Sequence, residues 1–175
     1  MTAPWPDLAI RALVESDLAA YKALRDHALV HHAQAFTSDA PTEARRTAES
    51  YRARLGGAPG EGFTLGAFRG DRLVGSISLE RDPRSKVRHV GHVVGTMVRA
   101  DEMRRGIGRA LLDALIARAA ADEELHQLTL SVTAANAAAV RLYEQAGFTR
   151  YGTLPRAIRV EGRFHDKDLM VLNLR

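Results

Sequence analysis

The sequence predicts an α+β fold with a mixed sheet, and three patterns in the chain support this class. Two β-rich runs joined by Gly70 and Asp71 are typical of a hairpin. Two strand-then-helix units follow between residues 87 and 147, where the spacing of apolar residues changes from strand-like to helical. Two further β-like runs near the C-terminus indicate a closing hairpin. Elements in this order are typical of α+β proteins.

Size and composition indicate one globular domain. The chain has 175 residues, so residues 1–175 are expected to form a single domain. With 46% hydrophobic and 26% charged residues, the composition excludes disordered and collagen-like chains. No apolar run approaches the ~18 residues of a membrane span, and the N-terminus lacks the cationic head and apolar stretch of a secretion signal. We therefore expect a cytoplasmic protein with no membrane partner.

Cysteine content and charge limit the chemistry. The cysteine count is 0, which excludes disulfides, thiolate metal sites and a cysteine acyl-enzyme. The 25 basic and 21 acidic residues leave a net charge of +4, which favours anionic ligands such as phosphates. The basic residues are scattered along the chain and are not clustered with aromatic residues, so no nucleic-acid partner is expected.

Before the first hairpin, the sequence predicts one strand and two helices. An apolar run over residues 8–13 indicates the opening strand, and polar residues 15–17 offer helix caps. A helix is expected over 18–30, where apolar residues recur at helical spacing. After a polar loop broken by Pro41, a second helix is expected from residue 42 to the glycine pair at 56–57.

The other strands are predicted from runs rich in β-branched and apolar residues. The hairpin strands are expected within residues 63–80, and a long central strand follows over 87–98. A further strand is expected over 126–133. The closing hairpin joins 156–160 to 169–174 through a polar turn that begins with Glu-Gly.

The first candidate site is the segment RRGIGR, which lies between the central strand and a helix expected over 104–121. Glycine lets the backbone come close to a ligand, and the first N–H groups of a helix bind phosphate. The segment is neither a dinucleotide fingerprint nor a P-loop, because its spacing fits neither. Alone, such a G-x-G is at least as often a closely packed helix start. The candidate binding residues are Arg104, Arg105, Gly106, Ile107, Gly108 and Arg109.

The second candidate site is an N-x-x-A-x-x-L-Y pattern over residues 136–143, followed by Gly147 and Phe148. Asn136 and Tyr143 are seven residues apart, so two helical turns place both side chains on one face. A phenol there can act as an acid. The simpler interpretation is a helix cap at Asn136 and an amphipathic tyrosine at the edge of the core.

Together, in this order and thirty residues apart, the two patterns resemble those of the GNAT (GCN5-related) N-acyltransferase family. The family's acetyl-CoA signature is Gln or Arg, two residues, and then G-x-G or G-x-A. Gly106 and Gly108 match the glycines, whereas Met103 occupies the Gln or Arg position. Backbone N–H groups hold a pyrophosphate in such a loop, and the arginines at 104 and 105 can supply the missing charge. The resemblance covers nearly the whole chain.

The resemblance implies a fold, a donor and a class of acceptor. The implied fold is a central, mixed, mostly antiparallel sheet of about seven strands flanked by about four helices. Acetyl-CoA is implied as the acyl donor, a primary amine of a small molecule or peptide as the acceptor, and no metal. The resemblance leaves the oligomeric state open, with a homodimer as the default expectation.

The resemblance also implies where the cofactor binds. The backbone of Thr96, Met97 and Val98 would pair with the pantetheine like an extra strand. Asn136 would bind the amide-bearing arm or a neighbouring carbonyl, and the 104–109 loop would bind the pyrophosphate.

The implied reaction is direct attack of an amine on the thioester, in which Tyr143 matches the acid near the sulfur. A lysine-like amine has a pKa near ~10.4, so a base must take its proton at pH 7. His92 stands where histone-acetylating members carry a Glu, and histidine suits that role. Ribosomal-protein-acetylating members carry a Glu at the position of Ser131. Their variant of the mechanism is therefore not expected here. His89, Glu80 and a relay water remain alternatives, as does a structural role for His92.

Two other interpretations stay open. A non-catalytic CoA-binding or regulatory module on the same fold is the alternative to an enzyme, and the presence of Tyr143 favours the enzyme. His27 and His31 have the spacing of a metal pair but no third ligand, so no metal is expected there. The aromatic residues expected in the core or in packing contacts are Trp5, Tyr51 and Phe164.

Overall fold

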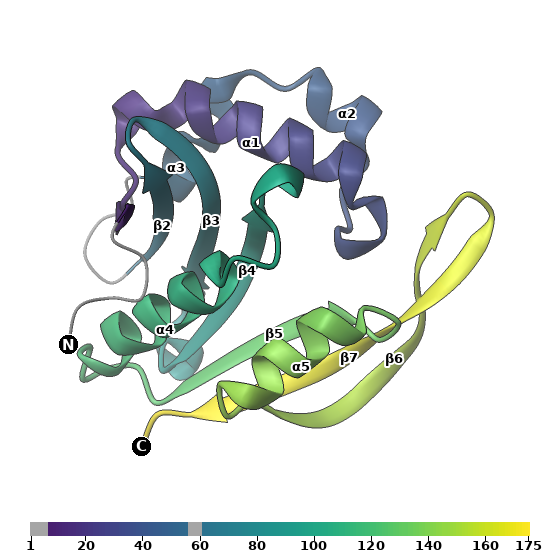
Figure 1. Cartoon of the computed structure of the whole chain (residues 1–175). Helices are drawn as coiled ribbons and strands as arrows, with labels where there is room; N and C mark the ends of the chain where they lie inside the picture. Colours follow the sequence, from purple (N-terminus) through teal and green to yellow (C-terminus); the bar gives the residue numbers. More distant parts are fainter. Residues whose placement is uncertain (1–6, 56–60) are drawn as a thin grey trace.

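A computed structural model describes residues 7–55 and 61–175, which fold into one mixed sheet with helices on both faces (Figure 1). In this part of the chain, seven strands lie in the order β1-β2-β3-β4-β5-β7-β6. Neighbouring strands are antiparallel except β4 and β5, which are parallel. The strands are β1 (Leu8–Ala12), β2 (Gly62–Arg69), β3 (Arg72–Arg81), β4 (Val90–Val98), β5 (Gln127–Thr133), β6 (Thr149–Val160) and β7 (Arg163–Asn173). The predicted α+β class and sheet are confirmed.

The described residues form five α-helices, two of which are long. These are α1 (Leu18–His31), α2 (Ala40–Ala44), α3 (Arg52–Leu55), α4 (Ile107–Ala120) and α5 (Ala137–Gln145). Helices α1 to α3 lie over one face of the sheet, and α4 and α5 lie over the other (Figure 1). No helix among the described residues combines the length and apolar character needed to cross a membrane.

Each face of the sheet has its own core. On the α4 side, the predicted apolar face of the helix packs on β2 to β5, with Ile107, Leu111 and Leu115 fully buried. A Cβ at Gly75 would lie 3.1 Å from both Ile107 and Leu111, so glycine there lets α4 approach β3 closely. On the α1 side, the helical spacing expected over 18–30 buries a second cluster against the sheet.

The helix predicted from residue 42 to the glycine pair is wrong. The chain instead forms α2, a turn, and a 3-10 turn that leads into α3. Asp39 caps α2 by accepting the Thr42 N–H at 2.8 Å, so Pro41 lies in the first turn, where its missing N–H costs nothing. Tyr51 then donates a hydrogen bond to Glu43. Residues eight apart in one helix are separated by ~12 Å along its axis, so a continuous helix cannot make this contact. The predicted end at 56–57 lies outside the described residues.

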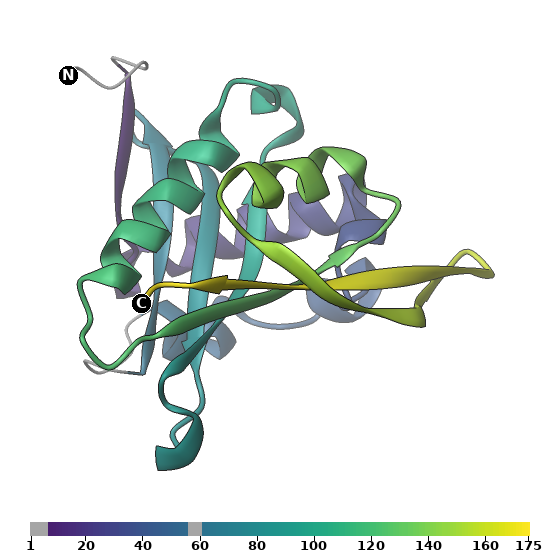
Figure 2. The ribbon, with the colours of Figure 1, turned by 90° about the horizontal axis from the view of Figure 1, so that it is seen from below.

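The closing hairpin is longer than predicted and carries an exposed aromatic residue. Strand β6 begins at Thr149 rather than at residue 156, and the hairpin projects from the body of the molecule (Figure 2). Phe164 is 55% exposed near its turn and lies beside the Arg159 guanidinium, so of the two expected positions it has a packing contact and not a place in the core. Tyr51 is buried as expected, and Trp5 lies outside the described residues.

The sheet splits between β4 and β5. These parallel strands share only three register pairs, which run from Val90 opposite Gln127 to His92 opposite Thr129. Beyond that point, among the described strands, β4 pairs only with β3, and β5 pairs only with β7. The register with β3 shifts around Gly95, which has a φ of 61°, and such a bulge bends a strand away from its neighbour. A gap therefore opens between the C-terminal halves of β4 and β5 (Figures 1 and 2).

Candidate active site

Two cavities flank the gap between β4 and β5. The first, with a volume of about 350 Å³, lies among the end of β4, the start of α4 and the helix α5. The second, of about 260 Å³, is lined by β4 around Gly95, by β5 at Ser131 and by residues from the α1 side. Ala35 and Phe36, in the segment after α1, line both cavities. Molecules bound in the two cavities would therefore meet at the gap.

The first cavity contains most of the residues predicted to bind the cofactor. Its lining includes Thr96, Met97, Val98, Arg104, Gly106, Ile107, Gly108, Arg109 and Asn136. Three predicted site residues, Arg105, Tyr143 and His92, are not among the lining residues. The structure thus brings the two motifs together with the end of the central strand.

Backbone geometry at the start of α4 suits an anion. Gly106 is the N-cap residue with a φ of 75°, and the Ala110 N–H makes the first bond of the helix, to the Gly106 carbonyl. The N–H groups of the first turn have no carbonyl partner within the helix. A Cβ on Gly108 would lie 3.6 Å from Leu142, which is ordinary contact. The chain's own packing therefore leaves room for a side chain at Gly108, and its absence keeps the cavity open.

The arginines of the loop have different partners. Arg105 lies 3.3 Å from Glu102, a buried carboxylate that also accepts a hydrogen bond from Arg69 at 3.0 Å. Arg109 pairs with Asp113 at 2.8 Å on the helix surface. Arg104 lines the first cavity and has a φ of 60°. Of the two arginines expected to replace the missing charge, Arg104 is therefore the one placed at the cavity.

Tyr143 connects α5 to the strand on the far side of the gap. Its hydroxyl donates a hydrogen bond to the Thr96 Oγ1 at 3.2 Å, and Thr96 lines the first cavity. The side chain is buried, with its ring edge-on to Phe148. Burial raises the pKa of Tyr143, and the hydrogen bond to Thr96 opposes that shift only in part. The phenol therefore stays protonated at neutral pH.

Asn136 has the cap geometry that the sequence predicts. Its Oδ1 accepts the Ala139 N–H at 3.2 Å, and the residue also borders the first cavity. The helix ends before Gly147, whose φ is 97°.

The candidate bases lie at the closed end of the split. His92 is exposed, and its Nδ1 lies 2.7 Å from the Thr129 Oγ1. Glu80 stands opposite His92 on β3 and pairs with Arg54 at 2.7 Å. His89 precedes β4 with its ring edge-on to His126. None of the three candidates is among the residues lining the two cavities beside the gap.

Two histidines considered as a metal pair have structural partners. The rings of His27 and His31 stack with centroids 4.0 Å apart. The His27 Nε2 accepts the Ala100 N–H at 3.2 Å, which ties α1 to the segment after β4.

The charged residues of the second cavity are not predicted by any pattern in the sequence. Arg25 of α1, Arg54 of α3 and Lys167 of β7 line it together. Their positions are far apart in the chain and share no motif, so no local signal could have grouped them. His32, which lines the first cavity, was also missed. Burial, and then the nearby His31, lower the pKa of His32, which favours its neutral form.

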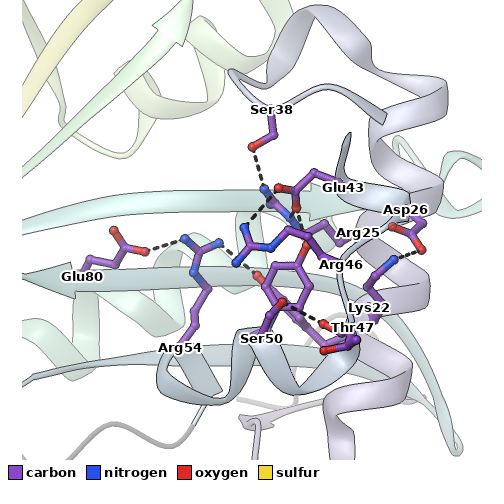
Figure 3. Close-up of polar contacts among 12 residues, drawn as sticks. Lys22, Arg25, Asp26, Ser38, Glu43, Arg46, Thr47, Ser50, Arg54 and Glu80 are labelled. Atoms are coloured by element: carbon purple, nitrogen blue, oxygen red, sulfur yellow. Dashed lines mark hydrogen bonds and ion pairs between the residues drawn. The ribbon is translucent and has the colours of Figure 1, made fainter. Parts of the chain in front are cut away.

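A buried network holds the arginines in place (Figure 3). The Arg25 Nε donates to Glu43 at 2.7 Å and its Nη2 to Ser38 at 3.1 Å. Arg46 lies 3.3 Å from the same Glu43 carboxylate. Burial acts to raise the pKa of Glu43, but hydrogen bonds from Tyr51 and Arg25 outweigh it and lower the pKa to about 2.

Comparison with known proteins identifies the class. Residues 25–148 match the acetyltransferase (GNAT) family, so the chain belongs to this family. The resemblance to this family, inferred from the two motifs, is confirmed.

Relatives and solved structures agree with this assignment. An L-methionine sulfoximine/L-methionine sulfone acetyltransferase of Pseudomonas aeruginosa is 39% identical over 77 residues, which are 44% of this chain and 44% of that protein. A mycothiol acetyltransferase of Geodermatophilus obscurus is 38% identical over 124 residues, covering 69% of this chain and 39% of that protein. The matches thus span less than half the length of both relatives. A GNAT-family acetyltransferase from Streptococcus pneumoniae has a TM-score of 0.83 at 28% identity, over 95% of this chain and 98% of that one.

One solved structure of the same fold contains the expected donor. The yncA protein of Salmonella typhimurium, determined with its cofactor acetyl-CoA, has a TM-score of 0.76 at 24% identity. The match covers 96% of this chain and 94% of that chain.

Proposed function

We propose that this protein is an acetyl-CoA-dependent N-acetyltransferase that acts on a primary amine of a small molecule or peptide. The observation that carries the proposal is the gap between β4 and β5, which has one cavity on each side. The two cavities share the lining residues Ala35 and Phe36. A donor in the first cavity and an acceptor in the second would bring thioester and amine together in the gap.

The first cavity has the groups that a CoA ester requires. The edge of β4 at Thr96–Val98 faces away from β3, and its backbone groups can pair with the pantetheine amides as a neighbouring strand would. The first turn of α4, the glycine loop and Arg104 would hold the pyrophosphate. Asn136 would contact the pantetheine arm.

The chemistry follows from the residues around the gap. The amine nitrogen forms a bond to the acetyl carbon, and the bond from that carbon to sulfur breaks. A backbone N–H of β4 would stabilise the charge that develops on the carbonyl oxygen. Tyr143 would donate a proton to the departing sulfur through the Thr96 hydroxyl, which accepts its hydrogen bond and lines the first cavity. The sulfur leaves as a thiol.

We keep His92 as the proposed base, acting through water. Because its imidazole lies at the closed end of the split and not on the cavity lining, direct contact with the amine is not supported. His89 and Glu80 are the alternatives at the same end. The amine must lose one proton, and water lets any of these groups receive it.

Other expectations remain proposals. Two relatives are named for small-molecule acceptors, which supports a small-molecule amine over a peptide. A cytoplasmic location, a single domain over residues 1–175 and a homodimer are proposed from the sequence and the family.

The proposal is tested by measuring CoA release with a panel of amines, comparing the wild type with Tyr143→Phe. We expect amine-dependent CoA release and an acetylated product in the wild type, reduced strongly in the variant. If acetyl-CoA binds but no amine is acetylated, the protein is a CoA-binding module. If acetyl-CoA does not bind, both interpretations are wrong.

A further inference from the structure

We propose that the acceptor is an anionic amine, in which an acid group close to the amino group is held by Arg25, Arg54 and Lys167 in the second cavity. This inference rests on the proposed function, because that function makes the second cavity the acceptor site. The recognised chemistry is a carboxylate or a phosphorus acid group on a small molecule.

The lining of the second cavity is strongly cationic. Arg25, Arg54 and Lys167 all face it, and no Asp or Glu is among its lining residues. The other polar side chains on its wall are hydroxyl groups, at Thr37, Ser38 and Ser131. Cations and hydroxyl groups both donate hydrogen bonds, so the wall suits a ligand that accepts them. The volume of about 260 Å³ is near the lower end for ligand cavities, ~300 Å³, which favours a small molecule.

The charges are held in position without using all their donors. The Arg25 side chain is 8% exposed, and its contacts to Glu43 and Ser38 use only part of the five N–H groups of a guanidinium. Arg54 donates to Glu80 at 2.7 Å (Figure 3). It does so from a different nitrogen than the one near Tyr21. The Lys167 Nζ donates to the Thr37 Oγ1 at 2.8 Å. Donors held in this way need little reorganisation to bind an anion.

The neighbouring carboxylates do not neutralise the site. Four cations lie in and around the cavity, namely Arg25, Arg46, Arg54 and Lys167. Two carboxylates can balance only two of these charges, because Arg25 and Arg46 share Glu43 and Arg54 pairs with Glu80. Within the described residues, Lys167 has no ion-pair partner. Burial lowers the pKa of Lys167, as expected for an ammonium group removed from water without a counterion. A bound acid group would supply that counterion.

This arrangement also affects the reactive amine. Positive charge near an ammonium group lowers its pKa and raises the fraction of neutral, nucleophilic amine. The same charge repels acceptors that carry additional cations, such as polyamines. One cluster can therefore select the acceptor and favour its reactive form.

The test compares matched acceptors that differ only in the acid group. For each amino acid of a panel, kcat/KM is measured for the free acid, for its carboxamide and for its phosphonate analogue. We expect the free acid or the phosphonate to exceed the amide by about 10- to 100-fold, the range for hydrogen bonds to a charged group. The better of the two identifies the acid group. Equal or better rates with the amides would overturn the inference while leaving the acetyltransferase proposal intact.

Two variants locate the effect. Arg54→Gln and Lys167→Met are each expected to reduce the acid-to-amide ratio about tenfold, chiefly through KM for the acid, while the Kd for acetyl-CoA stays unchanged. The matched control is Arg52→Gln, which should keep the acid-to-amide ratio. Arg52 is two residues from Arg54 on α3, and its exposed guanidinium pairs with Glu15. An unchanged ratio in both cavity variants would also refute the assignment. If no amine is acetylated at all, the proposed function itself is wrong.

Discussion

The Tyr143 hydroxyl donates a hydrogen bond to the Thr96 side chain at 3.2 Å, across the gap where β4 and β5 no longer pair. Tyr143 lies on the helix that follows β5, whereas Thr96 lies in β4, so the bond joins the two sides of the split. Burial raises the pKa of Tyr143, which keeps the phenol protonated. The contact therefore places a proton donor next to the first cavity.

Replacing Tyr143 by Phe removes this proton donor while keeping the ring. If Tyr143 protonates the departing sulfur, we expect kcat to fall about 10²-fold with a much smaller change in KM for acetyl-CoA, because an interaction of the transition state is then lost. Steady-state kinetics with saturating amine measure the effect. Tyr151→Phe, the same change at an exposed tyrosine of β6, is the control and should be silent. A wild-type rate in the Tyr143 variant would show that the tyrosine only packs.

Gly108 tests the pyrophosphate loop. A Cβ would lie 3.6 Å from Leu142, and alanine is favoured over glycine in a helix by roughly 0.5–1 kcal/mol, so Gly108→Ala should keep the thermal stability. We expect weaker acetyl-CoA binding in Gly108→Ala and none in Gly108→Glu, because a side chain blocks the approach of the phosphates. Isothermal titration with acetyl-CoA measures both. Unchanged affinity in a folded Gly108→Glu protein would place the cofactor elsewhere.

The role of His92 is tested by the pH dependence of the reaction. If it accepts the proton through water, kcat/KM should fall at low pH along a limb that requires the imidazole. The variant His92→Ala should lack this limb. Ionisation of the amine adds a second limb, which moves when acceptors of different pKa are compared. A low-pH limb that is unchanged in the variant would assign the proton to His89, Glu80 or a water chain.

Glu43 tests how much the buried network beside the second cavity contributes to stability. Its carboxylate is buried against Arg25, and removing one partner of a buried pair typically costs about 3–5 kcal/mol, so Glu43→Gln should unfold at clearly lower denaturant concentration. Glu15→Gln breaks the exposed pair with Arg52 and should change stability by less than about 1 kcal/mol.

The contribution of Glu43 should also depend on pH. Its pKa in the folded protein is about 2, below the ordinary value of 4.5. A lowered carboxylate pKa stabilises the fold fully above the ordinary value, and the contribution is lost as pH falls through the folded pKa. The difference in stability between the wild type and Glu43→Gln should therefore shrink from pH 5 toward pH 2. A difference that stays constant over this range would contradict the assignment.

The sequence by itself determined the elements whose signals are local. Helical spacing of apolar residues located α1 and α4, and the caps at Asn136 and Gly147 bounded α5. These features depend on backbone geometry within a few residues, so they can be read without the rest of the fold. Most of the residues expected to bind the cofactor also line the first cavity, whereas His32, Ala35 and Phe36 were not predicted to do so. The break in the helix after Pro41 was missed, and it brings Tyr51 and Arg25 to the same Glu43 carboxylate, contacts between residues that are distant in the sequence.

Only the tertiary structure decided how these residues are combined into a site. The gap between β4 and β5 depends on a bulge at Gly95 and on strand pairing between distant segments. The same pairing brings Arg25, Arg54 and Lys167 to one cavity, although they come from α1, α3 and β7. It also leaves His92 at the closed end of the split. Contacts between residues so far apart in the chain leave no periodic pattern in the sequence, because long-range packing, not local backbone preference, creates them.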